Sequence, residues 1–181
     1  MEKANSHSAI LHMTVIGIFA AFMCITAPWT VPVGPIPITL ATFSIYLSSA
    51  TIGWKRSGAA VAIYLLLGFV GLPVFSGFAG GIQRLIGATG GYLIGYIPMA
   101  VITGAFVDKF KKTWAFPIGM IAGTAVLYTF GTAWYCIMSG VGIIPAMMGC
   151  VVPFLAGDAI KIAAATALAA KLRPFVRGLV R

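Results

Sequence analysis

The run IIPAMMGCVVPFLAGDAIKIAAATALAA, residues 143–170, decides the class of fold. It is longer than the roughly 20 apolar residues that a helix needs to cross a bilayer. Its charged side chains, Asp158 and Lys161, lie three residues apart and so share one helix face. A charge at mid-bilayer depth costs roughly 2.5–3.5 kcal/mol on insertion scales. The pair therefore predicts a polar binding centre that faces the bundle interior, and a self-neutralising structural pair is the alternative.

The composition is that of an integral membrane protein. Hydrophobic residues make up 60% of the chain and charged residues 8%, whereas soluble domains average about 25% charged residues. The first apolar run is long enough to span and is followed by no small-residue cleavage site, so we expect it to be retained. The net charge of +9 lies in short loops between apolar runs. It therefore indicates membrane orientation and not nucleic-acid binding.

Six apolar runs predict an all-α fold with six transmembrane helices, forming a single membrane domain over residues 1–181. Two of the connections are unusual. Residues 29–37 are rich in proline and residues 72–91 are rich in glycine, so both are predicted to be irregular loops. The six runs are 10–28, 38–52, 58–71, 92–107, 114–138 and 143–170.

The basic residues predict the orientation of these spans. If all six cross the bilayer, ten basic residues fall on one side and Arg84 falls on the other, which is a strong positive-inside bias. Both termini are then cytoplasmic, the proline-rich and glycine-rich loops are outside, and Arg84 approaches Asp158 and Lys161 across a pocket that opens outward. The ten residues are Lys3, Lys55, Arg56, Lys109, Lys111, Lys112, Lys171, Arg173, Arg177 and Arg181.

The polar residues favour binding over catalysis. The acids are Glu2, Asp108 and Asp158, and orientation places only Asp158 within the membrane, so no carboxylate dyad forms. His7 and His12 show no H-E-x-x-H spacing, and the cysteines show no metal spacing. We therefore expect neither enzyme activity, nor a metal, nor a cofactor. The polar set suits a small ligand that carries N–H donors and a carbonyl or carboxylate.

Four motifs carry a resemblance to a known family. They are PIPITLATF (35–43), GLPVFSG (71–77), GATGGYLIG (87–95) and PFLAGDAIK (153–161), in this order along nearly the whole chain. With them the chain resembles the BioY family, the biotin-specific substrate-binding (S) components of energy-coupling-factor (ECF) transporters. Family members often have Gln in place of Ala41 and Pro in place of Ala88, so no role is carried over to these two positions.

The resemblance implies a multi-pass protein of the prokaryotic cell membrane that captures biotin from outside. It also implies partners, namely a transmembrane coupling protein and two ATPase subunits. The family's acid–lysine pair falls on Asp158 and Lys161, and its basic residue falls on Arg84. We expect Asp158 to accept from the ureido N–H groups, Lys161 to donate to the ureido carbonyl, and Arg84 to bind the tail carboxylate. The substrate-binding set is completed by Thr89, Tyr92 and Trp134.

Small residues on the first span predict a helix–helix contact. Gly17, Ala20 and Ala21 allow close backbone approach, either to a partner's helix or within the chain itself. Because the chain has no ATP-binding motif, we expect a partner to supply the energy.

Two alternative functions remain at this point. One is a proton-coupled secondary transporter of a small carboxylate-bearing solute, with Asp158 as the relay. Such folds often contain inverted repeats, and residues 1–80 and 85–170 show no convincing similarity. The other is a purely structural membrane subunit that binds no ligand.

Overall fold

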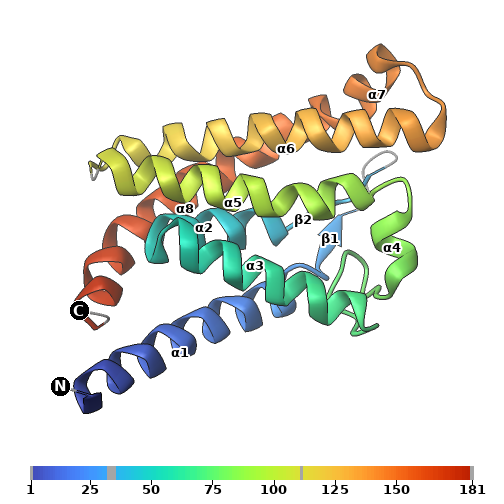
Figure 1. Ribbon diagram of the computed structural model, residues 1–181. Coiled ribbons are helices and arrows are strands. Elements are labelled where there is room, and N and C mark those ends of the chain that lie inside the picture. Colours follow the sequence, from blue (N-terminus) through green and yellow to red (C-terminus); the bar gives the residue numbers. More distant parts are fainter. Residues whose placement is uncertain (1, 32–35, 111, 180–181) are drawn as a thin grey trace.

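The computed structural model describes residues 2–31, 36–110 and 112–179. The described chain is a bundle of helices with one short antiparallel hairpin, in which Thr30 pairs with Thr39 and Val31 with Ile38 (Figure 1). The elements are α1 (Glu2–Thr26), β1 (Thr30–Val31), β2 (Ile38–Thr39), α2 (Ala41–Ile52), α3 (Trp54–Phe69), α4 (Ile82–Ile86), α5 (Gly90–Phe110), α6 (Ala115–Ser139), α7 (Ile143–Cys150) and α8 (Val152–Leu179).

The first five predicted runs are occupied by α1, α2, α3, α5 and α6, and the sixth is occupied by α7 and α8. The sixth run differs from the prediction of one continuous helix. It breaks at Val151 (φ −121°, ψ −55°) into α7 and α8. Pro153 explains the break, because it has no N–H to donate to a preceding turn but is tolerated in the first turn of a new helix. The second part, α8, continues well past residue 170 to Leu179.

The helices differ in how well their lengths suit a membrane. Four segments are long and apolar enough to cross one: Ala9–Thr26, Gly90–Phe110, Ala115–Ser139 and Ile143–Gly178. In contrast, α2 and α3 have 12 and 16 residues, or roughly 18 and 24 Å of helix. Nearly all of α2 is buried by its neighbours. A short helix at membrane depth is tolerated when protein covers it.

Close packing of α5 on α6 forms one wall of the bundle. At Gly123 an added Cβ would overlap Thr103 Oγ1, and it would lie 2.8 Å from the Met99 carbonyl oxygen. At Gly119 it would lie 3.1 Å from the Thr103 carbonyl oxygen. These two glycines, four residues apart, therefore allow the close approach that packing inside a membrane requires.

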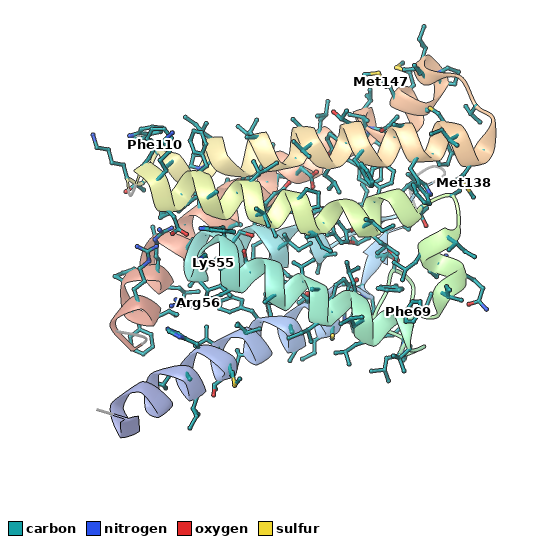
Figure 2. All side chains as sticks on the ribbon, in the orientation of Figure 1. Lys55, Arg56, Phe69, Phe110, Met138 and Met147 are labelled. Atoms are coloured by element: carbon teal, nitrogen blue, oxygen red, sulfur yellow. The ribbon has the colours of Figure 1, made fainter. Side chains whose placement is uncertain are left out.

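The two ends of the bundle differ in composition. The N- and C-terminal ends of the chain, the α2–α3 turn and the α5–α6 connection lie at one end, whereas the β hairpin, α4 and the α6–α7 connection lie at the other (Figure 1). Lys55 and Arg56 lie at the first end, and Phe69, Met138 and Met147 lie at the second (Figure 2). We call them the basic end and the loop end. This grouping is the one that the predicted topology requires.

Arg173 is not a solvated charge at the basic end, although the sequence placed it in a charged terminal segment. It is 7% exposed. Its guanidinium donates to the carbonyl oxygens of Ala50 (2.7 Å) and Val107 (3.2 Å) and to Asp108 Oδ1 (2.8 Å). Arg173 thus satisfies free carbonyls near the C-terminal ends of α2 and α5 and joins both helices to α8. Arg177 also pairs with Asp108.

Asp108→Asn is expected to destabilise the bundle, because it leaves Arg173 without its anionic partner. Removing one partner of a buried ion pair costs about 3–5 kcal/mol; here the loss should be nearer the lower bound, since Asp108 is 27% exposed. A lower midpoint of thermal unfolding in detergent would show this. Lys112→Gln, an exposed position at the same end, should leave the midpoint unchanged. A midpoint for Asp108→Asn equal to that of wild type would mean that the network contributes no stability.

Candidate functional site

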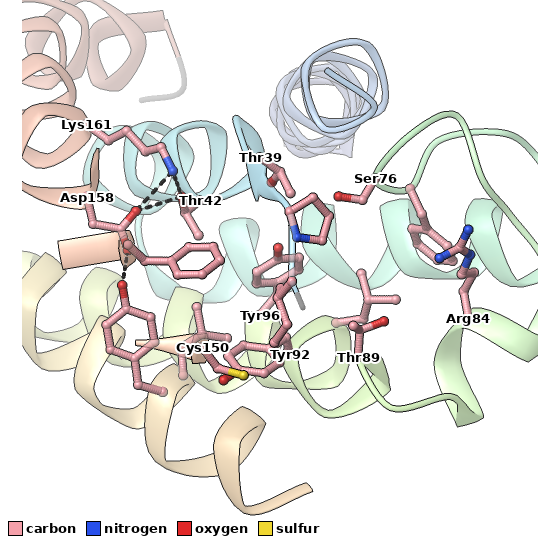
Figure 3. Close-up of a pocket in the computed structure, with 17 residues that line it drawn as sticks. Thr39, Thr42, Ser76, Arg84, Thr89, Tyr92, Tyr96, Cys150, Asp158 and Lys161 are labelled. Atoms are coloured by element: carbon pink, nitrogen blue, oxygen red, sulfur yellow. Dashed lines mark hydrogen bonds and ion pairs between the residues drawn. The ribbon is translucent and has the colours of Figure 1, made fainter. Parts of the chain in front are cut away.

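A cavity of about 140 Å³ lies within the loop-end half of the bundle. Helices α2, α5, α6 and α8 form its sides, and the hairpin and the 72–89 loops border it. Its lining residues are Ile36, Pro37, Thr39, Thr42, Phe75, Ser76, Arg84, Thr89, Tyr92, Leu93, Tyr96, Leu127, Tyr128, Cys150, Phe154, Asp158 and Lys161. Polar groups gather at its two ends, and mainly apolar or aromatic groups lie between them (Figure 3).

One polar end of the cavity, which we call the inner end, is centred on the carboxylate of Asp158, which is 4% exposed. Lys161 Nζ donates to Asp158 Oδ1 at 3.0 Å, so the two predicted charges are paired. Four side chains from three helices, those of Asp158, Lys161, Thr42 and Tyr128, come together here. Thr42 Oγ1 on α2 donates to the same oxygen at 3.3 Å and accepts from Lys161 at 3.0 Å. The hydroxyl of Tyr128 on α6 donates to Oδ2 at 2.6 Å.

The other polar end, which we call the outer end, is formed by Ser76, Arg84 and Thr89 (Figure 3). Arg84 comes from the short helix α4, and within the described residues it forms no ion pair. The buried hydroxyl of Ser76 has no hydrogen-bond partner within the described residues. A buried polar group without a partner costs free energy, so this end has hydrogen-bonding capacity left for a ligand.

The walls between the two ends are rigid and largely apolar. Tyr92 is fixed by a hydrogen bond between its hydroxyl and Thr132 Oγ1 (2.8 Å). Its ring packs so closely on Gly131 that an added Cβ there would overlap it. Tyr96 is 6% exposed and Cys150 is 1% exposed. Apolar walls with a few fixed polar groups are typical of small-molecule sites.

Five of the six residues predicted to bind substrate line this one cavity: Asp158, Lys161, Arg84, Thr89 and Tyr92. Trp134 does not line it. Its indole Nε1 instead donates to the carbonyl oxygen of Gly87 at 3.0 Å, and its side chain packs over Gly91. Trp134 therefore holds the segment that carries Arg84 and Thr89, and any effect that it has on the cavity acts through that segment.

Five polar residues of the cavity were missed at the sequence level: Thr39, Thr42, Ser76, Tyr96 and Tyr128. Thr42 lies in PIPITLATF and Ser76 in GLPVFSG, so the motifs contained them without assigning a role. For Tyr128 there was a weaker signal. A tyrosine inside an apolar span needs a partner for its hydroxyl, but the sequence does not say which one.

The small residues of α1 do not share one environment. Ala20 is 2% exposed and packs in the hydrophobic core, whereas Gly17 and Ala21 are exposed. Within the span Ala9–Thr26 only 11% of residues are buried, against 61% in Gly90–Phe110. The outer face of α1 is thus free, and of the three predicted interface residues it presents Gly17 and Ala21.

Metal binding has no support in this geometry. Within residues 2–31, 36–110 and 112–179, no group of three His, Cys, Asp or Glu side chains is placed to hold a metal ion. The cysteines Cys24, Cys136 and Cys150 are unpaired thiols.

Comparison with known proteins gives consistent matches. The family model described as "BioY family" matches residues 1–178. A "Biotin transporter BioY" of Thermotoga maritima is 39% identical over 159 residues, which cover 87% of this chain and 92% of that protein. A "Probable biotin transporter BioY" of Pyrococcus horikoshii is 32% identical over 161 residues, covering 89% and 95%. The crystal structure of an S-component for biotin from an ECF-type ABC transporter superposes with a TM-score of 0.85 at 26% identity, covering 92% of each chain.

Proposed function

The chain belongs to the BioY family, whose members are transporter components and not enzymes, and from this premise we propose that it is the biotin-binding S component of an ECF transporter. The observation that carries the proposal is the cavity with two polar ends. One end holds the Asp158–Lys161 pair and the other holds Arg84 (Figure 3). Biotin likewise has a ureido ring at one end and a carboxylate at the other.

The inner end suits the ureido ring. Asp158 accepts from a ureido N–H, and Lys161 donates to the ureido carbonyl. Thr42 and Tyr128 hold the carboxylate from α2 and α6, so the acceptor is oriented before the ligand arrives. Such preorganisation lowers the cost of ordering on binding. The aromatic walls then contact the apolar ring and chain of biotin.

The outer end suits the tail carboxylate. The guanidinium of Arg84 offers a planar fork of N–H donors that matches a carboxylate. The hydroxyl of Ser76, which lacks a partner in the described part of the chain, supplies one more donor. Thr89 lies on the side of the cavity that carries Arg84, and Tyr92 lines the wall between the two ends.

Calorimetry of the detergent-purified chain with biotin tests the proposed function. We expect saturable binding of one biotin per chain, and no comparable heat with a carboxylic acid of similar length that lacks the ureido ring. An absence of heat with biotin, from a protein that is monodisperse and unfolds cooperatively, would overturn the proposal.

Arg84→Gln is expected to remove discrimination at the tail of the ligand. Wild type should prefer biotin over biotin amide, because only biotin carries a carboxylate for the guanidinium. In Arg84→Gln the two ligands should bind about equally, since a charged hydrogen bond contributes roughly 1.5–3 kcal/mol and that contribution is gone. Competition of each ligand with labelled biotin measures this. An unchanged preference for biotin would place the tail elsewhere.

We further propose six membrane-crossing helices with both termini in the cytoplasm and capture of biotin from outside, in the prokaryotic cell membrane. Apart from Arg84 and Lys161, which line the cavity, the described basic residues lie toward one end of the bundle (Figure 2), and this supports the orientation. Of the two short helices, α2 crosses within the protein's own interior and α3 crosses with one face exposed. Arg84 and Ser76 lie at the outward end of the cavity.

Cysteine labelling tests the topology. In a background without the native cysteines, Lys112→Cys is expected to react only with reagents that enter the cytoplasm, and Gly142→Cys should react from outside. The reason is that these positions lie in connections at opposite ends of the bundle. Labelling of Lys112→Cys in intact cells by an impermeant maleimide would invert the orientation.

Energy coupling is proposed to depend on partners. No nucleotide-binding motif occurs in the sequence, so a transmembrane coupling protein with two ATPase subunits would supply ATP hydrolysis. The free outer face of α1, around Gly17 and Ala21, is the surface that we assign to the coupling protein.

A further inference from the structure

A second cavity, of about 340 Å³, opens at the basic end of the bundle. It lies at the turn between α2 and α3, where the ends of α5 and α8 approach. Its lining residues are Ile52, Gly53, Trp54, Lys55, Arg56, Asp108 and Arg177. None of these residues lines the cavity of Asp158, so the two sites are separate.

The cavity carries more positive charge than its one lining carboxylate neutralises. Asp108 Oδ1 accepts from Arg173 and Arg177, and Oδ2 accepts from the backbone N–H of Trp54 at 3.2 Å. Both oxygens are therefore engaged. Within the described residues, Lys55 and Arg56 form no ion pair.

Within the described residues, neither cation has a carboxylate partner. Arg56 Nη2 lies 2.7 Å from the ring nitrogen His12 Nε2. Lys55 Nζ lies 5.2 Å from the centre of the Trp54 ring, a cation–π contact that leaves its N–H groups free. The first turn of α3, which begins beside them, has no acidic residue and no side-chain cap, so its dipole adds to the positive potential.

We propose that this cavity binds the phosphate of an anionic phospholipid headgroup. An ammonium and a guanidinium that line one cavity suit a phosphate, and basic pockets at the ends of transmembrane bundles bind lipid headgroups. Trp54 is 41% exposed beside the cavity, which is typical of a side chain at the membrane interface.

The surface next to the cavity indicates a lipid and not a free anion. Ile63 and Leu66 follow Lys55 by eight and eleven residues, so all three share one face of α3. Both side chains are exposed, by 39% and 62%. An acyl chain that runs from a headgroup held at Lys55 would lie along these two residues. The proposal is independent of biotin binding and concerns the opposite end of the molecule.

Native mass spectrometry of the full chain in detergent, titrated with phosphatidylglycerol or phosphatidylcholine of identical acyl chains and without biotin, tests the proposal. We expect wild type to retain phosphatidylglycerol preferentially. Lys55→Gln combined with Arg56→Gln should lower affinity for phosphatidylglycerol at least tenfold, since each basic residue near an anionic headgroup contributes about a fivefold factor. Lys55→Gln alone, which removes no hydrogen bond within the described residues, should cost about fivefold.

The matched control is Lys109→Gln combined with Lys112→Gln. It removes the same charge from the same end of the bundle, but neither residue lines the cavity, so phosphatidylglycerol affinity should stay within about twofold of wild type. An equal loss in this control would overturn the proposal in favour of diffuse attraction. Equal binding of phosphatidylcholine would overturn it too. Displacement of phosphatidylglycerol by millimolar inorganic phosphate would show a free-anion site instead.

Discussion

Asp158→Asn is expected to lower the affinity for biotin by at least tenfold while leaving the chain folded. The substitution keeps the size of the side chain but removes the charge that accepts from Lys161, Thr42 and Tyr128. A hydrogen bond to a charged group contributes roughly 1.5–3 kcal/mol, and about 1.4 kcal/mol corresponds to tenfold in affinity. Calorimetry in detergent measures the loss, and thermal unfolding checks the fold.

Lys161→Met should weaken binding similarly, because it removes the donor to the ureido carbonyl and leaves the carboxylate of Asp158 with only Thr42 and Tyr128. Tyr128→Phe should have a smaller effect, since it deletes one hydroxyl that acts on biotin through Asp158. Thr129→Val is the matched control on the same helix. Its hydroxyl bonds only to the backbone of Ala125, so its removal should leave affinity unchanged.

Wild-type binding by both Asp158→Asn and Lys161→Met would show that the pair is structural and that the proposed site is wrong. An intermediate pattern is also informative. A loss in Asp158→Asn with normal binding in Lys161→Met would mean that the lysine only neutralises the carboxylate and does not reach the ligand.

The sequence predicted the inner centre of the site because charge is rare in this chain. Two charged side chains inside an apolar run cost insertion free energy unless they contact polar groups, so Asp158 and Lys161 could be predicted as site residues from the sequence. Their partners could not be found in the same way. Thr42 lies 116 residues from Asp158 in the sequence, and Tyr128 lies 30 residues from it. A threonine or a tyrosine in an apolar helix costs too little free energy to indicate a binding site by itself.

The differences between the predicted and the observed structure have local physical causes. The break between α7 and α8 depends on a single backbone turn at Val151, and the apolar character of residues 143–170 continues through it. Arg173 was counted only among the basic residues of one membrane side, whereas its side chain is buried and donates to three acceptors on α2 and α5. Trp134 was predicted to complete the substrate-binding set, whereas its indole donates to the backbone carbonyl of Gly87 and its side chain does not line the cavity.

The second large effect that we expect is a loss of biotin uptake without a loss of biotin binding, caused by substitutions on α1. Contact between helices in a bilayer gains nothing from hydrophobic burial, because lipid tails are equally apolar, and so depends on close backbone approach. On α1, Gly17 and Ala21 are exposed and one turn apart. Within the described residues, an added Cβ at Gly17 would meet no atom within 4 Å outside the backbone of its own helix. A larger side chain at either position would therefore disturb a partner and not the chain's own packing.

Ala21→Leu, with Gly17→Leu as a harsher version, is expected to retain biotin affinity in detergent. Both should lose co-purification with the coupling protein and lose biotin uptake in cells, because the partner helix is held away by the added side chain. Ala20→Leu is the contrasting variant. Since Ala20 is buried in the core, it should destabilise the chain itself and lower biotin binding along with assembly.

Two results would contradict this division of α1. Loss of biotin binding in Ala21→Leu would mean that the exposed face is needed for packing within the chain. Unchanged uptake in both Gly17→Leu and Ala21→Leu would mean that the coupling protein docks on another surface. Met13→Leu provides a matched control, because Met13 is 72% exposed on the same helix and its replacement adds no bulk. It should leave binding, co-purification and uptake at wild-type levels, so that loss in the Gly17 and Ala21 variants reports close approach at those two positions alone.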